Sequence, residues 1–168
     1  EMITSFTDQV VMVRLTADAP GKITFNAVLT TPHQDALIAT DGDCVTLSGV
    51  SSWHEGLKGK VEFQGRLATK IKGGNSCCKD GVLLVENADE AVVYVSIATN
   101  FNNYQDITGD QVQRAKDYLT KALKQDYREA KKSHVAFFKQ YMDRVSLDLG
   151  ANKEEMVTTD MRVQNFGN

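Results

Sequence analysis

Through its first two thirds the chain alternates apolar and polar residues with a period of two, and turn-forming residues interrupt this alternation at short intervals. Successive side chains of a strand point to opposite faces, so the period predicts antiparallel strands with one buried face. Residues 9–16 and 22–30 are the first two such segments. Because Pro20 presets a turn between them and Gly21 can adopt a positive φ, we predict that they form a hairpin.

Two further turn signals, Asp41-Gly42 and Asp80-Gly81, stand between apolar segments and predict tight reversals between paired strands. Residues 61–71 alternate in the same way. No helical pattern separates these segments, which favours an antiparallel β-sandwich of about six or seven strands over alternating strands and helices.

The pattern changes after Asn103, where Thr108-Gly109-Asp110-Gln111 has the form of a capping box and predicts the start of a helix. Apolar residues then recur every three or four positions, at Val112, Ala115, Leu119, Leu123, Tyr127, Ala130, His134, Phe138, Tyr141 and Val145. This spacing predicts one long amphipathic helix or two, with part of the apolar stripe extending beyond the sheet. The residues expected to contact the sheet are Leu119, Leu123, Tyr127, Phe138 and Tyr141.

Charge and cysteine content narrow the possible partners. The net charge of −3 offers no basic surface for a phosphate backbone, so we expect no nucleic-acid partner. No apolar run of about eighteen residues is present, so we expect no membrane insertion. Cys44, Cys77 and Cys78 lack the spacing of a zinc or redox centre, and we expect free thiols, the latter two in a loop, with no metal and no cofactor.

Five segments carry a resemblance to a known family: residues 8–30 (DQVVMVRLTADAPGKITFNAVLT), 59–74 (GKVEFQGRLATKIKGG), 88–101 (ADEAVVYVSIATNF), 133–150 (SHVAFFKQYMDRVSLDLG) and 158–166 (TTDMRVQNF). Together, and in this order, they resemble glycoside hydrolase family 95. That family is typified by α-L-fucosidases, and some members act on α-L-galactosides.

The resemblance implies a division of the chain. Residues 1–103 would be part of the family's N-terminal supersandwich-type domain, residues 104–146 its helical linker, and residues 147–168 the lead-in to an (α/α)6 catalytic barrel. In that family the acid and the water-activating base lie in the barrel, and hydrolysis proceeds with inversion. We therefore expect the chain to be an inactive fragment whose catalytic domain is absent. The compartment stays open, with a secreted or periplasmic parent as the expectation.

The search for chemistry in the residues themselves assigns no catalytic, cofactor-binding or metal-binding residue. Acidic residues are scattered along the predicted strands and turns, at Asp8, Glu55, Glu62, Glu86, Asp89, Glu90 and Asp106. An inverting glycosidase needs two carboxyl groups about 6.5–9.5 Å apart, and the sequence pairs none of these. His33 and His54 resemble a catalytic base only superficially, and His134 on the helical stripe is better explained as a structural residue.

Aromatic residues in predicted loops suggest a contact surface, because a pyranose ring can lie on an aromatic face. Trp53, Phe101 and Tyr104, together with His134, are the candidates for a glycan contact or a contact between domains. Packing in the core or at an interface is weighed ahead of glycan binding for these side chains.

Three functions follow from these observations. The first is the noncatalytic sandwich and linker of a family 95 hydrolase; the alternatives are a carbohydrate-binding module and a sandwich used for protein interaction. The expected partners are the protein's own catalytic domain, a fucosylated glycan, and a second copy of the fragment. Self-association would use the helical stripe or the segment QVVMVRL (residues 9–15).

Overall fold

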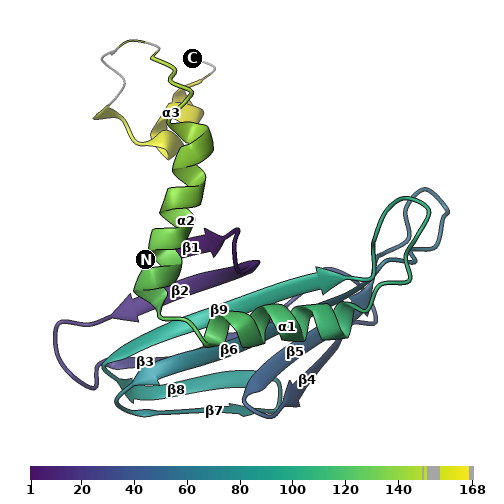
Figure 1. Cartoon of the computed structure of the whole chain (residues 1–168), viewed down its shortest axis with the longest axis horizontal. Helices are drawn as coiled ribbons and strands as arrows, with labels where there is room; N and C mark the ends of the chain where they lie inside the picture. The colour runs from purple at the N-terminus through teal and green to yellow at the C-terminus, as the bar shows by residue number, and fades with distance from the viewer. Residues whose placement is uncertain (149, 151–155, 167–168) are drawn as a thin grey trace. The chain divides into compact units, whose positions relative to one another are not determined.

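The structure, a computed structural model, describes residues 1–148, 150 and 156–166. These residues form strands β1 (Met2–Ser5), β2 (Val10–Thr16), β3 (Ile23–Val28), β4 (Leu37–Asp41), β5 (Cys44–Val50), β6 (Glu62–Lys72), β7 (Asn75–Lys79), β8 (Val82–Ala88) and β9 (Glu90–Thr99), and helices α1 (Gln111–Leu123), α2 (Tyr127–Met142) and α3 (Thr159–Asn165). The mainly antiparallel β fold with helices toward the C-terminus confirms the predicted fold class (Figure 1).

The described strands form two sheets. The central sheet has the order β1-β2-β9-β6-β5-β4, and the small sheet has the order β3-β8-β7. All neighbouring pairs are antiparallel. The strand count exceeds the prediction because β1 was not recognised, and because the apolar residues 82–99 are divided at Asp89 into two strands of different sheets.

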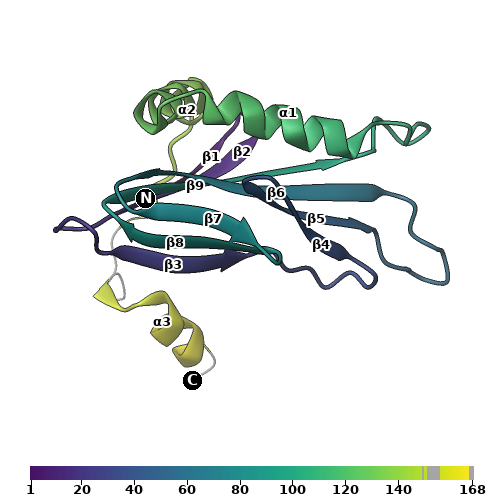
Figure 2. The ribbon, with the colours of Figure 1, turned by 90° about the horizontal axis from the view of Figure 1, so that it is seen from below.

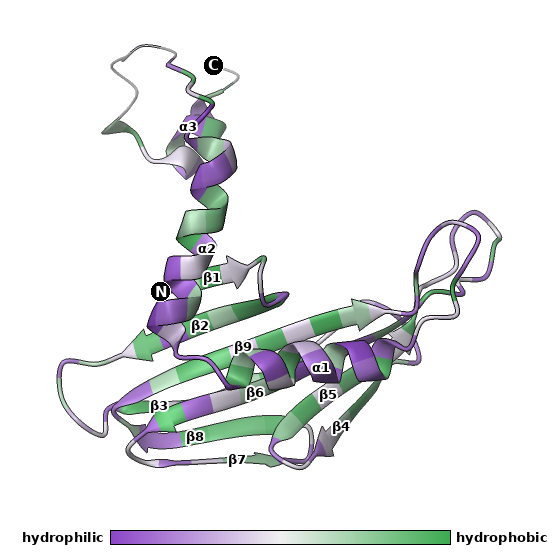
Figure 3. Cartoon of the chain, in the orientation of Figure 1, coloured by the Kyte–Doolittle hydropathy of each residue, from purple (hydrophilic) through white to green (hydrophobic). Residues whose placement is uncertain are grey.

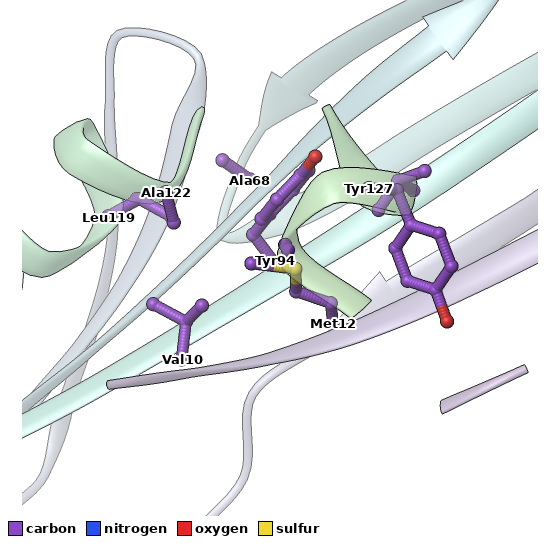
Figure 4. Packing of buried hydrophobic residues seen from close by; sticks show 9 residues of the cluster. Val10, Met12, Ala68, Tyr94, Leu119, Ala122 and Tyr127 are labelled. Atoms are coloured by element: carbon purple, nitrogen blue, oxygen red, sulfur yellow. The ribbon is translucent and has the colours of Figure 1, made fainter. Parts of the chain in front are cut away.

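The central sheet lies between two layers, with α1 over one face and the small sheet over the other (Figure 2). Between the two sheets is the sandwich core: Ile23, Val45, Leu67, Leu83, Val85, Ala88, Ala91 and Val93. Between the central sheet and the helices is the helix core: Val10, Met12, Ala68, Val92, Tyr94, Leu119, Ala122, Tyr127 and Ala130 (Figure 4). Apolar colour accordingly runs along β2 and β8, whereas α1 is banded (Figure 3).

The first predicted hairpin is wrong, although its turn is present. Gly21 adopts a φ of +69°, and its N–H donates to Asp89 Oδ1 at 2.7 Å. However, β2 pairs with β1 and β9, while β3 pairs with β8, so the turn carries the chain from one sheet to the other. Strands that are adjacent in sequence and apolar on one face fit either arrangement, and the alternation therefore could not separate them.

The other two predicted reversals are confirmed. Asp41-Gly42 connects β4 to β5, and Asp80-Gly81 connects β7 to β8 with φ values of +51° and +76°. Two successive positive φ values are the geometry of a type I′ hairpin turn, which matches the twist of the paired strands.

Two helices replace the single long one, which resolves the alternative that the sequence left open. Asp110 caps α1 by accepting a hydrogen bond from the Gln113 N–H at 2.9 Å, so the capping box predicted from Thr108 is wrong by two residues. At the other end, Lys70 Nζ donates to the carbonyl oxygens of Leu123 and Gln125. This lysine satisfies acceptors that the end of a helix leaves unpaired, and thereby fixes where α1 stops.

The apolar stripe is buried only in its first part. Leu119 and Tyr127 belong to the helix core, and Leu123 packs against it, as predicted. Phe138 and Tyr141 are 51% and 54% exposed, so the expectation that they bury against the sheet is wrong.

By packing, the chain divides into two compact units, residues 1–137 and residues 138–168. The first unit contains both sheets and α1, and it includes Phe137, whose ring stacks on Phe6 at a centroid distance of 4.3 Å. The second unit contains the end of α2 and all of α3, and in it Arg144 lies 5.8 Å from the centroid of the Tyr141 ring.

An ion-pair cluster joins three strands of the central sheet, and its pH dependence is testable. Glu90 on β9 accepts from Arg14 of β2 at 2.9 Å and lies 3.4 Å from Lys72 of β6. The hydrogen bond from Arg14, followed by that from Lys72, lowers the pKa of Glu90 below its ordinary value of 4.5. A carboxyl group whose pKa is lowered by folding stabilises the fold at pH values above its pKa in the unfolded chain. This contribution is lost as the pH falls through its pKa in the folded protein.

We therefore expect Glu90→Gln to lower the free energy of unfolding at about pH 7 and to lose less stability than the wild type on acidification to about pH 3. Urea melts at several pH values measure both effects. Glu86→Gln, an exposed position on β8, is the matched control and should follow the wild type. Parallel pH profiles for the wild type and Glu90→Gln would contradict this role for the cluster.

Candidate functional site

Two loops project from the same end of the central sheet and carry the predicted aromatic candidates (Figure 1). Residues 51–61 connect β5 to β6, and residues 100–110 connect β9 to α1. Because β6 and β9 are antiparallel neighbours, with Phe63 opposite Thr99, the start of one strand adjoins the end of the other. The register of the sheet therefore places both loops at one edge.

His33 anchors the loop that carries Trp53. The Ser52 N–H donates to His33 Nδ1 at 3.1 Å, and Ser52 Oγ lies 2.7 Å from the same nitrogen. The His33 ring in turn packs on Phe63, with centroids 5.2 Å apart. Sequence reasoning considered His33 only as a catalytic base and missed this role, because no local pattern reveals a contact between two separate loops.

The backbone of this loop is tightly constrained. A Cβ at Gly59 would overlap the carbonyl oxygen of Ser51, so only glycine fits there. His54 and Leu57 form an isolated antiparallel bridge that closes the tip. Asp35, in the neighbouring loop, adopts a φ of +59°, a left-handed conformation that is uncommon for a residue with a Cβ. The Gly59 contact and the bridge constrain residues 51–61, and the hydrogen bond between Ser52 and His33 joins this loop to the loop of residues 29–36.

Between residues 32–35 and residues 50–59 lies an open pocket of about 440 Å³. Its lining consists of Pro32, Gln34, Asp35, Val50, Ser51, Ser52, Trp53, Lys58 and Gly59. Trp53 lines it while remaining 67% exposed, so this side chain is not the core plug that sequence reasoning weighed as its main alternative. The lining combines the aromatic ring of Trp53 with a carboxylate that accepts hydrogen bonds, Asp35, and an ammonium that donates them, Lys58. Its amide and hydroxyl side chains can both donate and accept.

The second loop is held by Arg114 of α1. Its guanidinium donates to the carbonyl oxygens of Thr99 and Phe101 and to the side chain of Asn102. Tyr104 at the tip is 86% exposed, and Phe101 is half exposed. The sequence-predicted candidates Trp53, Phe101 and Tyr104 thus lie at one end of the central sheet, on two separate loops.

His134 is not brought to this end. It lies on α2, beyond the far end of α1. Helix α1 begins next to the 100–110 loop and is about 20 Å long, so it leads the chain away from that loop. His134 is partly buried, in keeping with a structural residue rather than a member of the loop site.

The candidate carboxylates are scattered through the fold, and most have structural partners. Asp8 is buried and accepts from the Ser5 hydroxyl at 2.6 Å and from Gln125 at 3.0 Å. Glu62 accepts from Gln111 at 2.6 Å, and Asp106 accepts from Thr108. Asp89 accepts from the Gly21 N–H, Glu90 contacts Arg14 and Lys72, and Glu55 lies 3.9 Å from His54.

Two of these carboxyls, Asp106 and Glu90, are stabilised as anions by their hydrogen-bond donors. Hydrogen bonds from the Thr108 hydroxyl and N–H, and then from Asn102, lower the pKa of Asp106, and the pKa of Glu90 is lowered by Arg14. A general acid in glycoside hydrolysis needs the opposite shift, since it must hold its proton near neutral pH. Neither carboxyl is suited to that role.

The placement of two cysteines differs from expectation. Cys77 and Cys78 lie in strand β7 rather than in a loop, and they are free thiols, as is Cys44. Burial, with the nearby Cys44 as a smaller cause, raises the pKa of Cys78 to about 11, which makes this thiol a poor nucleophile. Among the described residues, no cluster of His, Cys, Asp and Glu could hold a metal ion, and no described helix is long and apolar enough to cross a membrane.

The described strands and α1 form a two-sheet sandwich covered by a helix, and most of its candidate carboxylates contact neighbouring groups of the fold. The family described as glycosyl hydrolase family 65, N-terminal domain, matches residues 1–104, and the chain belongs to this family. No curated protein matches the chain. The match establishes a glycoside hydrolase N-terminal domain, whereas family 95 stays a prediction.

If His33 anchors the loop, removing its ring should loosen the backbone around Ser52 and Trp53. His33→Ala removes the acceptor of the Ser52 N–H, so we expect faster hydrogen exchange at the Ser52 amide and stronger acrylamide quenching of Trp53. His54→Ala changes an exposed histidine of the same loop and should leave both unchanged. Identical exchange and quenching in the wild type and His33→Ala would show that His33 does not hold the loop.

Proposed function

We propose that the chain is the noncatalytic sandwich and linker region of a family 95 glycoside hydrolase. Its parent enzyme hydrolyses terminal α-L-fucosyl or α-L-galactosyl linkages in glycans with inversion. The observation that carries the proposal is the family match over residues 1–104, which covers the sandwich and fixes its class. The resemblance of the five collinear segments to family 95 supports the finer assignment of family and substrate class.

The placement of the carboxylates supports a noncatalytic role. Inversion requires an acid and a base on opposite sides of the sugar, separated by room for a water molecule. In the described residues Asp8, Glu62 and Glu90 are engaged by neighbouring side chains of the fold itself. We therefore assign both catalytic carboxyls to an (α/α)6 barrel following residues 147–168.

The catalytic domain is the proposed partner of the exposed apolar residues toward the C-terminus. Phe138, Tyr141, Val145 and Leu147 are all half exposed or more. Large exposed apolar side chains in succession are typical of a protein contact. Self-association of the fragment stays a prediction; β2 is paired on both sides, so edge pairing at this part of the sheet would use β1.

The proposal predicts where activity resides. The 168-residue chain should show no turnover of an aryl α-L-fucoside above the uncatalysed rate, because it supplies neither catalytic carboxyl. The parent enzyme should release fucose with inverted anomeric configuration, observed by NMR immediately after mixing. If the chain does show turnover, it is repurified and assayed again. An unchanged specific activity would then exclude a contaminating hydrolase.

Aryl α-L-galactoside and aryl α-D-glucoside are the comparison substrates. Turnover of the L-fucoside or L-galactoside, but not of the D-glucoside, by the parent supports family 95 specificity. Exclusive action on the D-glucoside would contradict it, and sustained turnover by the repurified chain would contradict the noncatalytic role.

A further inference from the structure

We propose that the pocket between residues 32–35 and residues 50–59 binds one pyranose unit of a glycan, with Trp53 as its apolar platform. Asp35, Gln34 and Lys58 would be the hydrogen-bonding partners of the sugar hydroxyls. This site is separate from hydrolysis, and only the choice of L-fucose as its first probe rests on the proposed function.

The composition of the pocket matches the two-sided chemistry of a sugar ring. A pyranose presents C–H groups that pack on an aromatic surface and a rim of hydroxyls that both donate and accept. Trp53 offers the first kind of surface. Asp35 can accept hydrogen bonds, Lys58 can donate them, and the Gln34 amide can do both, so the lining offers donors and acceptors to the sugar hydroxyls.

Charge and size favour a neutral, small ligand. The lining holds one carboxylate, Asp35, and one ammonium, Lys58, so their charges balance. The volume of about 440 Å³ falls in the range of about 300–1,000 Å³ that is usual for small-molecule sites. A phosphorylated or nucleic-acid ligand would need an excess of cationic groups, which this lining does not provide.

Contacts within the protein support the loops that line the pocket. His33 ties the Ser52 backbone to the neighbouring loop, and the close approach of Gly59 to Ser51 fixes the far side. A preformed site loses less conformational entropy on binding than a flexible one. Trp53, which is 67% exposed on this loop, is available to a ligand.

The chain contains a single tryptophan, so its fluorescence under selective excitation of tryptophan reports on this pocket alone. Titration of the full chain with methyl α-L-fucoside, methyl α-L-galactoside and methyl α-D-glucoside should give a saturable change with at least one glycoside. We expect a Kd of about 1 mM, as suits a single sugar on one aromatic platform. Calorimetry provides a second readout that does not depend on the fluorophore.

Two variants and one control locate the binding. Trp53→Ala and Asp35→Gly should each weaken binding about tenfold or more. Binding to Trp53→Ala is measured by calorimetry, because this variant lacks the fluorophore. Glycine accepts the positive φ of Asp35, so the second variant removes the carboxylate without straining the loop. Leu57→Ala changes an exposed residue of the same loop that does not line the pocket, and it should bind as the wild type does.

The absence of a saturable signal up to about 50 mM of every glycoside would overturn the site, as would unchanged binding in both variants. Binding of the separately produced catalytic domain to the Trp53 loop without any sugar binding would also overturn it and would assign the surface to a domain contact. The activity assay of the parent enzyme has a different readout, so failure of this site leaves the proposed hydrolase function standing.

Discussion

The burial of the central sheet on both faces is the constraint on which the rest of the fold depends. Alternate residues of β9 enter different cores: Ala91 and Val93 face the small sheet, while Val92 and Tyr94 face the helices. A strand buried on both sides cannot be half polar, and AVVYVSIA in β9 is accordingly almost continuously apolar. The sheet therefore needs α1 as a covering layer as much as it needs the small sheet.

This constraint also determines which surfaces remain for function. Because α1 is committed to the helix core, its buried face is not available to another domain. Exposed large apolar side chains elsewhere include Trp53 and Tyr104 at the loop end of the sheet and several residues from Phe138 onward. The family match ends at residue 104, yet α1 shares a core with the matched strands, so the structural unit extends beyond the match.

The sequence predicted the elements better than their partners. Alternation and the Asp-Gly signals placed most strands and two reversals, because strand period and turn conformation are local properties. The predicted pairing of β2 with β3 is wrong because a sandwich can place consecutive strands in different sheets. The predicted burial of Phe138 is wrong because a helical stripe does not show where the sheet beneath it ends. For the candidate site, the sequence supplied Trp53, Phe101 and Tyr104 but not the pocket, which depends on a contact between His33 and Ser52 across two loops.

The role of α1 as a layer of the core is tested most directly by the stability of Leu119→Ala against Val112→Ala. Leu119 is 3% exposed in the helix core, whereas Val112 on the same helix is 44% exposed. The account predicts from urea melts a loss of about 2–5 kcal/mol for Leu119→Ala and a change within about 0.5 kcal/mol for Val112→Ala. Equal, small changes for both variants would contradict it and would show that α1 is a free linker rather than part of the sandwich.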